Sequence, residues 1–337
     1  MPNKSGPVLR RLRDVVLVLL CLLWTVVTVA VAGLMALSVP ALDDPSPKAR
    51  GTGHDAEWLG HAWVDGRKTQ SDVDDLARRL RGTGIKDLFV HAGPFDDDGT
   101  LDPAKDSRAA WAVRALHQAL PGVRVQAWLG AHAVPGQVRL GDPATRGRLL
   151  TSIGQVLDDG FDGVHLDFEP VVDGDPDLLG LLDAAHAVTR QRGVLLSVSA
   201  SHTSPAPLLA PAAGAVGWAV WSNGYLHQVA VRVDQVALMV YDSGLPTRAA
   251  FGGYVRRATL DALDAVPPGV ALFIGLPAYH DDNLVHHADV ETVGVTLRGV
   301  RQAVGDRPPA RVFGVAIYVD FTITDDDWAT YRADWDG

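Results

Sequence analysis

The chain has 337 residues, of which 47% are hydrophobic, 21% charged and 7% aromatic, and its formal net charge is −10. With 34 glycines, 21 prolines and one cysteine, this composition excludes a disordered chain, a disulfide scaffold and a collagen-like repeat. The length suits either one large α/β barrel or two average domains. Beyond residue 39 the chain holds 39 acidic and 26 basic residues, and so acidic a protein is unsuited to binding nucleic acid.

A stretch without charged side chains, residues 15–39, is long and apolar enough to span a bilayer as a helix. Basic residues precede this stretch and acidic residues follow it: Lys4, Arg10, Arg11 and Arg13 before, Asp43 and Asp44 after. The positive-inside rule therefore places residues 1–14 in the cytoplasm, residues 15–39 in the membrane as a signal anchor, and the rest outside. A cleaved signal peptide is the alternative, because small residues surround Pro40. Cys21, the single thiol, lies within the predicted span.

Residues 40–56 are rich in proline, glycine and charge without apolar periodicity, which predicts a stalk or linker. The remainder, residues 57–337, is predicted to form one domain. Eight short apolar runs in it fit β-strands: residues 58–64, 87–93, 123–130, 162–169, 194–201, 235–242, 271–279 and 312–321.

Stretches with helical spacing separate these strands, including the intervals around residues 225, 254 and 296. Five helix starts are predicted. Ser71 with Asp74 forms a capping box, and Asp106 is a capping residue. Asp142 and Asp175 each cap a helix whose first residue is a proline, and Thr324 precedes three aspartates. Regular alternation of strand and helix predicts a (β/α)8 TIM barrel, with a doubly wound open sheet as the alternative. In a TIM barrel the chemistry lies at the C-terminal ends of the strands.

The fourth predicted strand carries three titratable residues on one face, in the sequence FDGVHLDFEP that begins at residue 161. Side chains alternate along a strand, so His165, Asp167 and Glu169 share the face that leads to the barrel mouth. A purely structural strand would place aliphatic residues there. Two carboxylates so close together raise one another's pKa, which makes Glu169, at the strand end, the candidate general acid.

This segment resembles the D-G-x-D-x-D-x-E signature of glycoside hydrolase family 18, the chitinase-like enzymes, with Asp162, Gly163, Asp167 and Glu169 as matches. Three later segments resemble the family in the same order: Met239 to Asp242 resembles M-x-Y-D, residues 275–279 resemble G-x-P-x-Y, and residues 314–320 resemble the eighth strand. The resemblance covers the predicted barrel but not the stalk or the membrane segment.

The resemblance implies substrate-assisted retaining hydrolysis of β-linked N-acetylglucosamine-containing glycans, without a cofactor or metal. Glu169 would protonate the glycosidic oxygen, Asp167 would orient the substrate's acetamido group, and Tyr241 would hydrogen-bond its carbonyl. Asp242, Met239, His165 and Tyr318 would contact the sugar. Tyr241 as an ordinary core tyrosine is the alternative at that position.

Two positions depart from the family pattern. His165 replaces the first inner acid of the motif, so a histidinium there would lower the Asp167 pKa instead of raising it. Tyr318 stands where the family has a tryptophan that forms the floor under the reacting sugar. Both substitutions are compatible with a slow enzyme or with a glycan-binding barrel that has lost turnover.

Aromatic and histidine residues near the strand ends offer further candidates. Trp218, Trp221 and Tyr279 are predicted to stack on sugar rings, while Trp63 and Trp128 fit core packing equally well. A metal-dependent hydrolase is the second alternative, because six histidines fall near strand ends: His61, His91, His132, His165, His202 and His280. Their spacing matches no known ligand motif, so no metal is expected.

Overall fold

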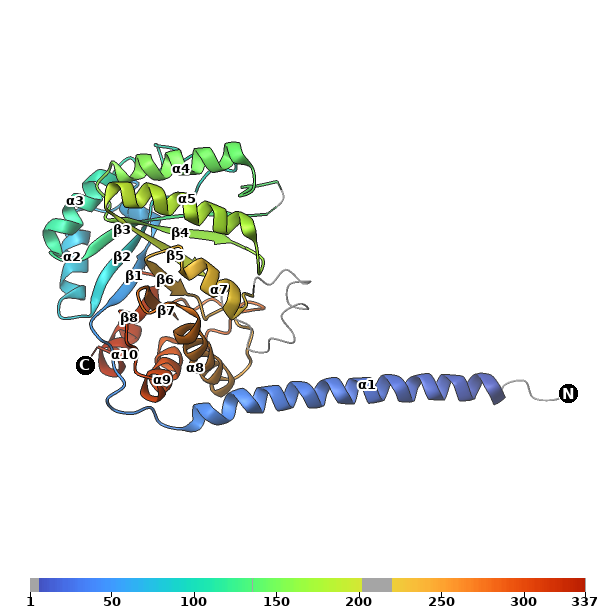
Figure 1. The fold of residues 1–337 in the computed structure, drawn as a ribbon. Helices are drawn as coiled ribbons and strands as arrows, with labels where there is room; N and C mark the ends of the chain where they lie inside the picture. Colours follow the sequence, from blue (N-terminus) through green and yellow to red (C-terminus); the bar gives the residue numbers. More distant parts are fainter. Residues whose placement is uncertain (1–5, 135, 202–219, 337) are drawn as a thin grey trace.

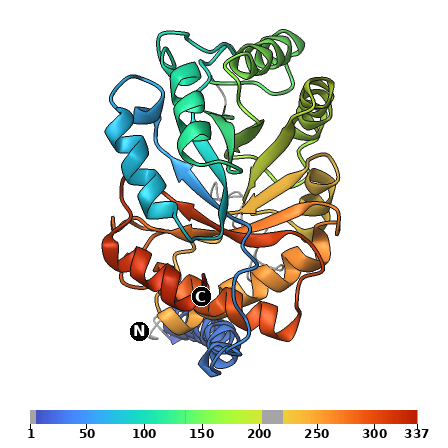
Figure 2. The same cartoon turned by 90° about the vertical axis from the view of Figure 1, so that its left-hand side faces the viewer.

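The computed structural model describes residues 6–134, 136–201 and 220–336. Eight parallel strands form a closed barrel in which each strand pairs with its neighbours in sequence and β1 pairs with β8 (Figures 1 and 2). The predicted TIM barrel is therefore confirmed, and the open sheet is excluded. The strands are β1 Asp55–Leu59, β2 Ile85–His91, β3 Arg124–His132, β4 Gly163–Glu169, β5 Leu195–Ala200, β6 Gln235–Leu238, β7 Ala271–Pro277 and β8 Phe313–Tyr318.

Helices surround the barrel, and a long helix, α1, projects from one side of it (Figure 1). The surrounding helices are α2 Gln70–Leu80, α3 Ala109–Ala119, α4 Pro143–Leu157, α5 Pro176–Arg192, α7 Asn223–Ala230, α8 Arg248–Ala265, α9 Val293–Asp306 and α10 Asp325–Asp334. The short 3₁₀ helix η2 spans His61–Trp63. Each helix runs back antiparallel to the strand before it, so the loops that follow the strands all lie at one end, the mouth.

Most predicted helix starts are confirmed, and two are wrong. The side chains of Asp142, Asp175 and Thr324 accept backbone N–H bonds from the first turns of α4, α5 and α10. Helix α2 begins two residues before the predicted capping box: Asp72 Oδ2 accepts the N–H and the hydroxyl of Thr69, both at 2.8 Å.

The second error concerns α3, which begins after Arg108 and has no side-chain cap. The backbone carbonyl of Asp106, and not its carboxylate, accepts the Ala109 N–H at 2.7 Å. The chain therefore makes a tight turn before the helix starts, where the sequence pattern predicted the helix to begin directly.

The apolar core has two layers because strand side chains alternate between the barrel interior and the surrounding helices. The interior layer consists of Ala56, Trp58, Phe89, Ala237, Ala271, Phe273, Ala316 and Val319. The larger layer packs between the strands and the helices. Polar residues close the end opposite the mouth, where Asp55 Oδ1 accepts from the Val315 N–H and Trp335 Nε1 and Oδ2 accepts from the Tyr331 hydroxyl.

The N-terminal apolar segment forms α1, Gly6–Ser38, followed by the 3₁₀ helix η1, Val39–Leu42. Within the described chain, α1 together with η1 is the one helical segment long and apolar enough to cross a bilayer, and a signal sequence has the same properties. Residues 11–33 of α1 are exposed, whereas Leu34 and Leu37 are partly buried.

The segment predicted as a stalk packs against the barrel, and β1 begins at Asp55, before the predicted domain boundary. Arg298 on α9 donates to the Ala41, Leu42 and Asp43 carbonyls at 3.0–3.4 Å. Arg301 donates to the Ala49 carbonyl at 2.9 Å. Backbone carbonyls that a free linker would leave to water are therefore bound by α9.

Candidate active site

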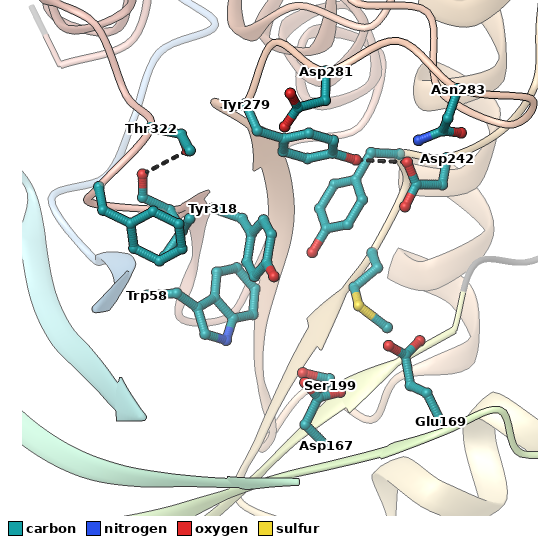
Figure 3. A pocket seen from close by; sticks show the side chains of 14 residues that line it. Trp58, Asp167, Glu169, Ser199, Asp242, Tyr279, Asp281, Asn283, Tyr318 and Thr322 are labelled. Carbon is teal, nitrogen blue, oxygen red and sulfur yellow. Dashed lines mark hydrogen bonds between the residues drawn. The ribbon is translucent and has the colours of Figure 1, made fainter. Parts of the chain in front are cut away.

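A cavity of about 370 Å³ opens at the mouth of the barrel (Figure 3). Its volume is in the usual range for small-molecule sites. Its walls come from strand ends and from the loops that follow β7 and β8. The lining residues are Trp58, Asp167, Glu169, Ser199, Met239, Tyr241, Asp242, Tyr279, Asp281, Asn283, Tyr318, Val319, Phe321 and Thr322.

Asp167 lies deep in this cavity, near the end of β4. Its Oδ2 accepts a hydrogen bond from Trp128 Nε1 at 2.9 Å, while Oδ1 has no hydrogen-bond partner among the described residues. Burial raises the Asp167 pKa, and hydrogen bonds from Trp128 and Ser199 oppose that shift. A carboxyl with one free oxygen facing a cavity can accept a proton or a hydrogen bond from a bound molecule.

Glu169 ends β4 and faces the same cavity as Asp167 (Figure 3). Burial of its carboxyl among protein groups raises its pKa to about 8, and the nearby charges of Asp167 and Asp242 add to the shift. The residue as a whole is nevertheless exposed, because its outer side reaches solvent. Glu169 therefore holds a proton at neutral pH and presents it to the cavity, as a general acid must.

Three tyrosines form the wall opposite Glu169. Tyr241 and Tyr318 stack at 5.6 Å between ring centroids, and Tyr279 meets both rings edge-on at 5.8 Å. Burial is the main cause that raises the pKa of Tyr241 far above its usual value, so its hydroxyl remains a hydrogen-bond donor. Burial likewise raises the pKa of Tyr318 to about 12.

Asp242 is held in an unusual backbone conformation beside these tyrosines. Its φ angle is +57°, in the left-handed region that non-glycine residues rarely adopt. The buried Glu291 carboxylate accepts the N–H groups of Asp242 and Ser243 at 2.7 and 3.0 Å. Tyr279 donates its hydroxyl to Asp242 Oδ1 at 2.7 Å, which orients the carboxylate in the cavity wall.

His165 lies beneath the cavity and does not line it. Its ring stacks on Phe89 at 3.9 Å, its Nδ1 is 2.7 Å from Ser197 Oγ, and Trp58 Nε1 donates to its Nε2 at 3.2 Å. Burial lowers the His165 pKa to about 3, so the ring is neutral. The expectation of a histidinium that lowers the Asp167 pKa is therefore wrong, and the expected sugar contact is absent from this geometry.

The other residues predicted to contact the sugar have three different outcomes. Trp221 is buried, donates Nε1 to the Val171 carbonyl at 2.9 Å and packs on Tyr225, so the described cavity does not include it. Trp218 lies outside the described residues. Met239 and Tyr279 line the cavity, and their contact with a sugar stays a prediction.

Sequence reasoning missed Trp58, whose ring meets Tyr318 edge-on at 5.7 Å on the cavity floor. It also missed Phe321 and Asn283, on the loops after β8 and β7. No motif marks these positions. The available signal for Trp58 was its place on the first strand, since the mouth is built from all eight strand ends.

A second cavity of about 350 Å³ adjoins the first and shares Asp167 and Glu169 with it. Its other lining residues are His91, Pro94, Phe95, Asp97, Trp128, Gly130, Ala131, His132 and Gln137. The two carboxyl groups therefore lie between two adjoining cavities. A bound molecule could place the two parts that flank one of its bonds in the two cavities, with that bond beside the carboxyl groups.

The strand-end histidines do not form a metal-ligand cluster in the part of the chain that the structure describes. His61 and His91 pair with one another, and His280 contacts Asp327 on α10. His202 lies outside the described residues. A different group, Asp242, His286 and Glu291, has ligand atoms within 4.8 Å of one another. The carboxylates of Glu291 and Asp242 already accept the hydrogen bonds described above.

No protein-family model matches the sequence, and no curated protein matches it. The fold, however, is shared with solved glycosidase structures. A Chromobacterium violaceum chitinase has 14% identity and a TM-score of 0.58, with 82% of this chain and 97% of that chain covered. The Bacillus megaterium spore cortex-lytic enzyme SleL has 13% identity and a TM-score of 0.58, with 86% and 76% covered.

An Ostrinia furnacalis Group IV chitinase in complex with allosamidin is similar to the same degree. Its identity is 16% and its TM-score 0.57, with 86% of this chain and 98% of that chain covered. At these identities the likeness establishes the fold. The chain has the barrel found in chitinases and spore cortex-lytic enzymes.

Proposed function

We propose that the protein is a membrane-anchored, extracytoplasmic glycoside hydrolase that cleaves β-linked N-acetylglucosamine-containing glycans with retention of configuration. The observation that carries this proposal is Glu169, a carboxyl with a pKa raised to about 8 at the mouth of a barrel, beside Asp167. Such a group is protonated at neutral pH and faces a hollow of suitable size. The shared fold with chitinases, one of them crystallised with allosamidin, supports the proposal.

In the first step the Glu169 proton moves to the glycosidic oxygen as the bond from that oxygen to the anomeric carbon breaks. The carbonyl oxygen of the substrate's own acetamido group forms a new bond to the anomeric carbon. In the second step the Glu169 carboxylate takes a proton from water, whose oxygen attacks the same carbon and releases the acetamido oxygen. Atoms and charges balance with no metal and no cofactor.

The neighbouring residues position and stabilise the acetamido group. Asp167 Oδ1, which has no hydrogen-bond partner among the described residues, would accept the acetamido N–H and support the positive charge that develops there. The Tyr241 hydroxyl, held protonated by its raised pKa, would donate to the acetamido oxygen. Trp58 and Tyr318 would form the floor beneath the sugar ring, in place of a single tryptophan.

The anchoring part of the proposal rests on α1. Its exposed apolar surface needs an apolar environment, which a bilayer provides. Acidic residues follow this helix and basic residues precede it, and by the positive-inside rule this charge distribution supports a barrel outside the cytoplasm. Release after signal cleavage is the alternative, and it would yield a protein that lacks α1.

The test is hydrolysis of an aryl N-acetylglucosaminide and of N-acetylglucosamine oligomers by the wild type and by Glu169→Gln. We expect kcat to fall on the order of 10²- to 10⁴-fold with little change in KM, because the variant cannot donate a proton. Asp183→Asn, at an exposed carboxylate on α5, is the matched control and should be unchanged. Full activity in Glu169→Gln would refute the acid assignment.

A glycan-binding barrel without turnover is the second candidate. The buried, neutral His165 favours it, because this residue stands in place of the first inner acid of the family motif and gives Asp167 no acidic neighbour there. This candidate predicts saccharide binding by calorimetry with no product after prolonged incubation. Measurable cleavage by the wild type would exclude it.

A further inference from the structure

The path of the N-terminal chain fixes the direction in which α1 leaves the barrel. A Cβ atom on Gly253, near the start of α8, would overlap the Leu37 carbonyl oxygen, so α1 touches α8 at its mouth end. Farther along, Ser46 and Ala49 lie against Gly305 near the end of α9, at the opposite end of the barrel. The chain therefore runs from the mouth to the far end between residues 37 and 49.

Because the chain travels away from the mouth after Leu37, the residues before Leu37 must extend past the mouth. Figure 1 shows α1 projecting on the side where β4 ends, and Figure 2, which looks along the barrel, shows α1 nearly end-on. The two views agree that α1 is roughly parallel to the barrel axis. A membrane crossed by α1 would therefore lie across the mouth end.

The exposed part of α1 is just long enough to cross a bilayer, so no part of this helix is left to separate the barrel from the membrane. Leu34 is the first partly buried residue of the helix, and Asp14 is the last charged residue before the apolar run. The helix between them is about 30 Å long, which equals the thickness of the hydrocarbon core. The bilayer must therefore begin directly where α1 leaves the barrel.

A second observation, independent of α1, marks the same end of the molecule. Among the residues that the structure describes outside α1 and η1, the three most exposed large apolar side chains are Leu284 (95% exposed), Phe321 (69%) and Val172 (62%). They lie on the loops after β7, β8 and β4, all at the mouth. Val231 and Val312, at the opposite end, are less exposed at 50% and 42%. Exposed apolar side chains that share one end of the molecule are suited to contact with an apolar surface such as a bilayer.

We propose that the barrel mouth faces the bilayer that α1 spans, with Leu284, Phe321 and Val172 resting on the lipid surface. This inference rests on the proposed membrane anchoring. The cleft would then receive glycans held close to the outer face of the membrane, which enter between the rim and the lipid. Glycan farther from the membrane would face the closed end of the barrel.

The test uses the full-length protein with Cys21→Ser, reconstituted in phosphatidylcholine vesicles. Leu284→Cys and, as the matched control, Val231→Cys are each labelled with the same environment-sensitive fluorophore. Both positions are exposed aliphatic residues, one on each end of the barrel, so neither change should disturb folding. Some of the vesicles carry lipids with a nitroxide quencher near the headgroup.

We expect the probe at position 284 to be quenched several-fold more by the labelled lipids than the probe at position 231, and to be shielded from iodide in solution. Equal quenching at the two positions, in protein that floats with the vesicles, would overturn the proposed orientation. Protein that does not float with the vesicles would overturn the anchoring, and the orientation with it. Neither readout depends on hydrolysis, so a failure of the glycosidase assignment remains a separate result.

Discussion

At the scale of single residues, the proposed chemistry depends on how the protein environment divides protons between two carboxyl groups. Burial and the neighbouring charge of Asp167 raise the pKa of Glu169 to about 8. Burial raises the pKa of Asp167 as well, but the hydrogen bond from Trp128 Nε1 opposes that shift. Two like groups in different surroundings therefore have different tasks, which is a general device for acid catalysis.

The raised pKa predicts a specific pH dependence. Glu169 must be protonated for the first step, so kcat/KM should fall as the pH rises through about 8. In Asp167→Asn the like charge is absent, and the residual activity should fall at a lower pH. Burial, the largest cause of the raised pKa, remains in this variant. The pH at which its activity falls should therefore stay above the ordinary pKa of glutamate. A profile that is flat to pH 10 would contradict the assignment.

Glu291 provides a second prediction at this scale, because it holds Asp242 in its left-handed conformation through the Asp242 and Ser243 N–H groups. Glu291→Gln replaces one accepting oxygen by a donor. We expect kcat/KM to fall on the order of 10- to 100-fold through misplacement of Asp242, with KM rising more than kcat falls.

Glu57→Gln is the matched control for that experiment. Glu57 is buried outside the cavity without a hydrogen-bond partner among the described residues, and burial raises its pKa well above the usual value. Burial already disfavours a charge at this position, so replacement by an uncharged amide should leave activity unchanged. If Glu57→Gln and Glu291→Gln lose activity equally, a general loss of stability explains both, and Asp242 positioning does not.

At the scale of elements, the docked segment between η1 and β1 is the feature that the sequence pattern described least well. Its proline, glycine and charge content is typical of a free linker. Its carbonyl groups are nevertheless bound by Arg298 and Arg301, which lie more than 250 positions away in the chain. Composition reports local preference, and no local pattern indicates a partner at that separation.

Removal of these contacts should free the segment. In Arg298→Ala/Arg301→Ala we expect faster cleavage by proteases between residues 39 and 54, with hydrolytic activity unchanged. Arg257→Ala is the control, because Arg257 pairs with Asp261 on the surface of α8 and not with the docked segment in the described part of the chain. Equal cleavage rates in the double variant and the wild type would show that the segment is held by other contacts. Limited proteolysis followed by mass spectrometry measures the difference.

The strands and most helices were predictable because apolar runs and caps are local. The site was predictable where one strand carries its own motif, as β4 does with Asp167 and Glu169, and where later motifs mark strand ends, as at Tyr241 and Tyr279. Trp58 was not predictable in this way, because it reaches the cavity only once β1 has paired with β8. Trp221 had a loop-like sequence context, yet a backbone carbonyl and Tyr225 hold it in the core.

At the scale of the whole molecule, closure of the barrel joins the first strand to the last helix. Asp55 on β1 accepts the Tyr331 hydroxyl at 2.7 Å and Trp335 Nε1 at 3.0 Å, both from α10 and its end. Tyr331→Phe removes the first bond without leaving a cavity, and the Asp55 carboxyl remains buried with one donor fewer. We expect a loss of about 1–3 kcal/mol in the free energy of unfolding, measured by urea titration. Superimposed unfolding curves would contradict this role.

The same closure has a consequence for biosynthesis. β1 and its partner β8 are far apart in the chain, so one edge of β1 has no partner until β8 has been synthesised. Exposed strand edges invite association with other chains. The first strand must therefore be shielded from other chains until β8 is in place, and a truncation before β8 would leave that edge open permanently.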